Sequence, residues 1–277
     1  MKVFTIVWLT LLEARRRKLT WLVLALSVAF MALYAVAFYF VYKDITRFES
    51  SGGTQLFETS NTLLLMGLYV VAFLTVMLGV LTSADTLAGE IASGTIHTVV
   101  TKPLRRWEVV VGKWLGYGIM LTGFVLLMSL GLTLIVRLIS GYSPPDLARG
   151  VALMVLQGWV VLTVSILGGT RLSTIANGVV ALMLYGLAFI AGWIEQIGAL
   201  TRNEAAVNIG IVTSLIMPSE AMWKRAAYLM QPPFLRELGI SPFGAASAPS
   251  VAMVAYAVVY MVVALALAVR LFERRDL

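Results

Sequence analysis

The sequence predicts an all-α fold, a polytopic integral membrane protein with six transmembrane helices in a single transmembrane domain, residues 1–277. Hydrophobic residues make up 60% of the chain and charged residues only 13%. The mean hydropathy is +0.91. A soluble domain of this length cannot bury so much apolar surface, and long apolar runs are the mark of membrane spans.

Six apolar runs have the length that a bilayer crossing requires, about 20 residues or roughly 30 Å of helix. Aromatic residues such as Trp21, Tyr42, Trp114 and Trp193 stand near the ends of the runs, as in the aromatic belts of membrane proteins. The predicted spans are residues 19–41, 63–81, 114–136, 151–168, 175–194 and 251–271.

The first 18 residues predict an interfacial helix that precedes the first span. An apolar stripe at helical spacing is followed by four consecutive basic residues, which favours a helix lying in the membrane interface. A secretory signal peptide would instead carry small residues at a cleavage site. The stripe consists of Phe4, Val7, Trp8, Leu11 and Leu12, and the basic run is Arg15 to Lys18.

Loop charges predict the orientation. With both termini on one side, the segments on that side hold 13 basic and 6 acidic residues, whereas the other side holds 8 of each. Cytosolic loops are the ones enriched in Lys and Arg, so both termini are expected in the cytosol of a multi-pass plasma-membrane protein. The net charge of +7 lies beside apolar runs, which disfavours binding to nucleic acid.

Residues 82–113 form the predicted cytosolic loop between the second and third spans. The preceding helix is expected to continue through Asp85, Thr86 and Glu90, until Ser93 and Gly94 end it. A second helix of about two turns is expected over residues 95–101, before Pro103. Such a short helix is not stable alone in water, so its neighbours or a partner must hold it.

This loop resembles the first cytoplasmic loop of the type 2 ABC exporter permeases. The matching residues are Glu90, Gly94, Thr95, Pro103, Arg105, Arg106, Gly112 and Lys113. The resemblance implies a coupling helix whose apolar residues Ile96, Val99 and Val100 dock into a groove on a separate ATPase subunit. Arg171, in the next cytosolic turn, is expected to contact the same partner. An ordinary interfacial loop that caps two helices remains the alternative.

The resemblance extends to most of the chain. The N-terminal helix is similar to the elbow helix of these permeases, and the tail 272–277 also matches. What this implies is a half-transporter that pairs with a second copy or a homologous permease and with two ATPase subunits. A non-transporting membrane scaffold or sensor that recruits a soluble partner is the competing hypothesis.

Three connections are expected to be external, and one of them, residues 141–150 with two prolines, is a tight turn. Residues 43–62, with a Ser-Ser-Gly-Gly sequence, predict a flexible connection of twenty residues. The 56-residue segment 195–250 contains two predicted helices, residues 204–217 and 219–230, which Pro218 separates. We expect an external cap lying partly in the interface. A re-entrant hairpin, which would have to be shielded by protein, is the alternative.

The chain lacks the residues for several kinds of chemistry. It has no cysteine and a single histidine, His97, so no metal site is expected. Its one Gly-Lys pair, Gly112-Lys113, is followed by Trp114 and cannot form a phosphate-binding loop. We therefore expect neither a cofactor nor enzymatic activity in this chain, and ATP and Mg²⁺ bound by the partner ATPase.

Polar residues within the predicted spans are few. No ionisable residue lies near the centre of a span, which disfavours a secondary transporter. Gln157 and Asn177 are expected to donate interhelical hydrogen bonds, and the small pair Gly112 and Gly116 is expected to permit close helix packing. Nothing in the sequence selects a substrate, although the lack of intramembrane charge favours a lipophilic or amphipathic one.

Overall fold

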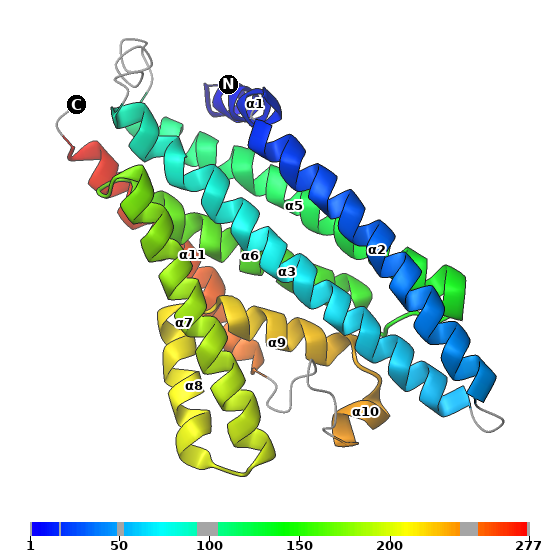
Figure 1. The fold of residues 1–277 in the computed structure, drawn as a ribbon. Coiled ribbons are helices and arrows are strands. Elements are labelled where there is room, and N and C mark those ends of the chain that lie inside the picture. The colour runs from blue at the N-terminus through cyan, green and yellow to red at the C-terminus, as the bar shows by residue number, and fades with distance from the viewer. Residues whose placement is uncertain (1, 17, 49–52, 93–104, 239–248, 276–277) are drawn as a thin grey trace.

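The computed structural model describes residues 2–16, 18–48, 53–92, 105–238 and 249–275, and all regular elements in these ranges are α-helices. Six of the described helices, α2, α3, α5, α6, α7 and α11, are long and apolar enough to cross a membrane, which confirms the predicted fold class. In Figure 1 both ends of the chain lie at one end of the bundle, beside α1, and α8 and α10 lie toward the other. The helices are α1 (Lys2–Arg16), α2 (Lys18–Phe48), α3 (Gly53–Ala92), α5 (Arg106–Ser140), α6 (Leu147–Gly169), α7 (Thr174–Leu200), α8 (Glu204–Ile216), α9 (Ser219–Met230), α10 (Pro233–Leu238) and α11 (Val251–Glu273).

The connection between the first two spans is much shorter than predicted. Helix α2 continues to Phe48 and α3 begins at Gly53, so only residues 49–52 separate the two helices. In the extension of α2 the Thr46 hydroxyl donates to the Tyr42 carbonyl at 3.1 Å. Beyond the start of α3, the buried Asn61 accepts a hydrogen bond from the Tyr142 hydroxyl at 2.9 Å. The prediction of a twenty-residue loop was wrong because polar residues end an apolar run without ending a helix.

Helices α5 and α6 are joined by a pair of tryptophans. The rings of Trp114 and Trp159 meet edge to face with centroids 4.5 Å apart. Their indole N–H groups donate across the helix pair, Trp114 to Thr163 at 2.8 Å and Trp159 to Thr122 at 3.0 Å. Each buried donor therefore has an acceptor, as a stable apolar interface requires.

Helix α1 packs closely on the beginning of α5 through the two small residues singled out in the sequence. A Cβ atom at Gly112 would lie 2.7 Å from Ile6, and one at Gly116 would lie 2.7 Å from Thr10. The close approach predicted for this pair is therefore confirmed. Phe4 and Trp8, on the other side of α1, are 76% and 58% exposed. The interfacial position of α1 stays a prediction.

The segment before the last span contains the two predicted helices, α8 and α9, which meet at an angle of 114°. Helix α8 packs along α7, whereas α9 turns into the bundle and packs mainly on α6. Six apolar side chains of α9 are at most 4% exposed: Ala221, Met222, Trp223, Ala226, Ala227 and Met230. The segment is thus partly core rather than a loose cap, and α9 has the protein shielding that a re-entrant hairpin needs. Its place relative to the membrane stays a prediction.

Candidate functional site

The sequence-predicted site residues divide into two groups. Gly94, Thr95, Ile96, Val99, Val100 and Pro103 lie outside the described residues. The others flank that gap or lie at the same end of the bundle: Glu90 in the last turn of α3, Arg105 and Arg106 at the start of α5, and Arg171 in the turn between α6 and α7. The structure brings these flanking elements together at the end where both termini lie (Figure 1).

Helix α5 begins directly after the gap. Arg105 and Arg106 lie at its N-terminus, where a contact within the first turn fixes the backbone. The backbone N–H of Arg105 donates to the carboxylate of Glu108, three residues later, at 2.8 Å. This contact satisfies a donor that the helix itself cannot pair, and the negative charge suits a helix N-terminus. Arg105 is exposed, whereas Arg106 is half-buried.

Arg106 holds the C-terminal tail. Its Nη1 donates to the carbonyl oxygens of Glu273 at 3.0 Å and Arg275 at 2.6 Å. These carbonyls stand at the end of α11, where oxygens lack intrahelical partners and a cation is favourable. Arg275 in turn donates from Nη1 to the Thr170 carbonyl at 2.5 Å, beside the turn that carries Arg171. The tail therefore links the start of α5 to the α6–α7 turn.

The end of α3 is tied to the same group of elements. Asn177 of α7 is buried and donates to the carbonyls of Ser165 at 2.9 Å and Ala84 at 3.4 Å. Its predicted role as an interhelical hydrogen-bond donor is confirmed, whereas the same prediction for Gln157 was wrong, because its buried side-chain amide has no hydrogen-bond partner among the described residues. The Thr174 hydroxyl contacts the Asp85 carboxylate at 3.3 Å, and the Lys113 ammonium contacts the Thr86 carbonyl at 3.3 Å. Hydrogen bonds thus link four elements that lie near the gap: the end of α3, the start of α5, the α6–α7 turn and the C-terminal tail.

This arrangement resembles a platform more than a catalytic site. The described residues contain no group of three metal-ligating side chains. The cations Arg105 and Arg171 are exposed on it, and most of the other polar side chains described above bond to backbone carbonyls. The geometry of this surface is fixed by many weak links.

A protein-family comparison decides the identity. The family described as "ABC-2 family transporter protein" matches residues 4–277, nearly the whole chain. The chain belongs to the ABC-2 transporter family. A search of the curated proteins finds no match. As an ABC-2 family member with six apolar helices, the chain is a multi-pass membrane protein and a transmembrane subunit rather than the ATPase.

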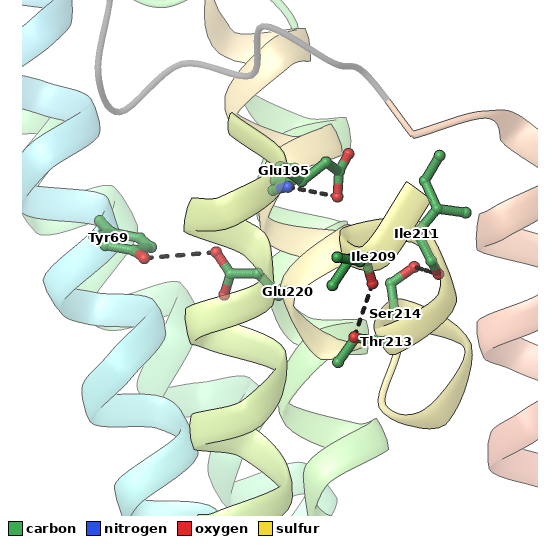
Figure 2. Close-up of polar contacts among 8 residues, drawn as sticks. Tyr69, Glu195, Ile209, Ile211, Thr213, Ser214 and Glu220 are labelled. Carbon is green, nitrogen blue, oxygen red and sulfur yellow. Dashed lines mark hydrogen bonds and ion pairs between the residues drawn. The ribbon is translucent and has the colours of Figure 1, made fainter. Parts of the chain in front are cut away.

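A second polar site in this ABC-2 family protein was missed by the sequence reasoning. Glu195, at the end of α7, forms an ion pair with Lys224 of α9, with 2.8 Å between Oε2 and Nζ. Glu220, one turn earlier on α9, accepts a hydrogen bond from the Tyr69 hydroxyl of α3 at 3.5 Å (Figure 2). Tyr69 accepts one from the Trp193 indole of α7 at 3.1 Å. These residues join three helices.

The buried carboxyl of Glu220 has an altered acidity. Loss of hydration raises the pKa of Glu220 to about 7, and this effect outweighs the attraction of the Lys224 ammonium, which lowers the pKa. Glu220 lies on α9, in the bent α8–α9 pair and outside the six helices that are long enough to span a membrane alone. The signal in the sequence was the Glu220 and Lys224 pair at i,i+4 on a helix that is otherwise mostly apolar. It was overlooked because the whole segment was expected to be external.

Proposed function

We propose that this chain is the permease subunit of an ATP-driven exporter in the plasma membrane. It forms the translocation path together with a second copy or a homologous permease. The energy comes from a separate ATPase subunit that binds ATP and Mg²⁺ and docks on the loop of residues 90–113. Membership in the ABC-2 transporter family supports the transport role, and the sequence of the chain contains no phosphate-binding loop of its own.

The observation that carries the docking part of the proposal is the cross-linked platform around that loop. A docked partner can act on the spans only if the docking segment is mechanically joined to them. Here α3 and α5 lead directly from the loop into the bundle, and the tail joins α5 to the α6–α7 turn. A displacement of one of these elements by the docked partner would therefore move several spans together.

The first experiment asks whether the energy source is a partner. Full-length chain, purified and reconstituted in lipid, is expected to hydrolyse ATP no faster than empty vesicles. Adding a cognate ABC ATPase subunit should give a complex that co-purifies and hydrolyses ATP. Co-purification without stimulated hydrolysis or transport would favour the scaffold or sensor hypothesis, and strong hydrolysis by the isolated chain would contradict the proposal.

The tail contact gives a second prediction. Arg275→Ala removes a charge-assisted hydrogen bond to the Thr170 carbonyl, and such bonds contribute about 1.5 to 3 kcal/mol when shielded from water. Because this contact is only partly buried, we expect coupling to weaken several-fold in the ATPase activity of the reconstituted complex. Arg274→Ala, at the exposed neighbouring residue, is the matched control. Equal ATPase activities for the two variants would show that the tail contact has no role in coupling.

Topology supplies a third prediction, because the chain has no cysteine to interfere. A cysteine at Thr201, exposed in the turn between α7 and α8, should react with an impermeant thiol reagent added outside intact cells. A cysteine at Ser173, exposed before α7, should react only after the cells are opened. The reverse pattern would overturn the assignment of both termini to the cytosol.

A further inference from the structure

Three charged side chains are enclosed where α7 and α9 meet. Glu195, Glu220 and Lys224 are 6%, 4% and 6% exposed. Full burial of charged residues is rare in proteins unless the charges are compensated, because hydration is lost. Figure 2 shows the ion pair at Glu195 and the contact between Tyr69 and Glu220 as two separate polar contacts.

The charges in this enclosure do not balance. Lys224 lies 2.8 Å from the Glu195 carboxylate, so its ammonium is already in a direct ion pair. Glu220 has only the Tyr69 hydroxyl, at 3.5 Å from Oε1, and its Oε2 is buried without a hydrogen-bond partner among the described residues. Two carboxylates and one ammonium leave one uncompensated negative charge.

Glu220 cannot leave this position easily. A Cβ atom on Gly192 of α7 would lie 2.5 Å from the Glu220 Cγ, so the backbone of α7 closes the site on that side. The rings of Tyr69 and Trp223 pack at 5.0 Å between centroids on the α3 side. An enclosed carboxyl that can neither move nor be hydrated must find a cation or be neutral.

The surrounding helices supply no further cation, and on α9 itself the one other cation, Arg225, donates to the Pro249 carbonyl. The groups that interact electrostatically with the Glu220 carboxyl are Lys224 on its own helix, Tyr69 from α3 and Glu195 from α7. The charge of Glu220 in turn affects Tyr185 of α7. On α6 the only charged residue is Arg149, whose side chain is 75% exposed in a surface pair with Asp146. On α8 it is the exposed Glu204. The charged residues of α11, Arg270 and Glu273, lie in its last turn, at the other end of the bundle.

We propose that Glu220 is a proton-binding site. One bound proton neutralises the cluster of Glu195, Lys224 and Glu220 and thereby stabilises the packing of α9 in the bundle. The proton sits on the Glu220 carboxyl, and the Glu195 and Lys224 pair stays ionised. Loss of the proton leaves a lone carboxylate between α3, α7 and α9. The bent α8–α9 pair is therefore held more weakly as the pH rises.

The test compares thermal unfolding of full-length wild type and Glu220→Gln in lipid nanodiscs across pH 5 to 8. The folded protein binds the Glu220 proton more tightly than the unfolded chain does, since its pKa is raised from 4.5 to about 7. The contribution of proton binding at Glu220 to the free energy of unfolding is thus fully present below pH 4.5 and is lost as the pH rises through about 7. We expect the wild-type Tm to fall by several degrees relative to Glu220→Gln over this window.

Glu204→Gln is the matched control, because it removes the same charge at an exposed position of the same hairpin. Its pH dependence should equal that of wild type. An unchanged pH dependence in Glu220→Gln would overturn the proposal. If that variant does not fold, infrared spectra of wild type decide: the carbonyl stretch of a protonated carboxylic acid should be present at pH 6 and disappear by pH 9, and its absence at pH 6 would overturn the proposal.

Discussion

Lys224→Met is expected to destabilise the protein by about 3 to 5 kcal/mol, because it leaves Glu195 buried without its cation. The same change leaves Glu220 without its nearest positive charge. For a chain of this size the loss corresponds to a fall in Tm of roughly 10 °C. Scanning fluorimetry of the purified protein in lipid or detergent measures it, with size exclusion to exclude aggregation.

Two further variants separate the ion pair from simple loss of a side chain. The double variant Glu195→Gln with Lys224→Met removes both charges of the pair. It should recover a large part of the lost stability below pH 7, where Glu220 is neutral and no lone charge stays buried. Arg149→Met breaks an exposed pair with Asp146 at 3.7 Å and should change stability by less than about 0.5 kcal/mol. A Tm for Lys224→Met equal to that of Arg149→Met would show that the buried pair contributes nothing.

Val99→Asp is expected to weaken docking of the ATPase at least 100-fold. If the apolar residues Ile96, Val99 and Val100 enter a partner's groove, the change buries an unpaired carboxylate at a cost of several kcal/mol, about 3 or more. Folding in the membrane should be unaffected, since the residue lies in the predicted cytosolic loop. Pull-down of the ATPase and stimulated ATP hydrolysis measure the effect.

Val99→Leu is the matched control for this change, because it keeps the position apolar and should bind as wild type does. Changes at Glu90, which acts through charge near the end of the docking segment, or at Arg106, which also holds the tail carbonyls, should reduce coupling less. A well-folded Val99→Asp that binds and stimulates the ATPase normally would contradict the coupling role of this loop.

The apolar runs predicted which helices cross the membrane but not where those helices end. Residues 63–81 marked the second span, yet α3 extends from Gly53 to Ala92. Hydropathy identifies the stretch that is apolar enough to lie in the bilayer core. Helix length also depends on backbone geometry and on stop signals such as Gly and Pro. The correct parts of the prediction, the break at Pro218 and the continuation of α3 through Glu90, both came from such signals.

The polar contacts could not be predicted in the same way. Arg275 contacts Thr170 across 105 positions of the chain, and Tyr69 contacts Glu220 across 151. Sequence periodicity reports which face of a helix is apolar but not which other helix covers that face. The apolar residues of α9 and the charges of Glu220 and Lys224 were visible, but their burial followed from the bend of 114° that turns the helix inward.

The uneven burial of the helices has a consequence for biosynthesis. Helix α2 exposes most of its apolar surface and contains no polar cluster that depends on a neighbour, so it can enter the bilayer as the chain emerges from the ribosome. The position of α9 is formed mainly by α6 and α7, both of which are synthesised earlier. We expect α9 to reach its position late, after those helices have assembled, so the pairing of Lys224 with Glu195 marks a nearly complete insertion.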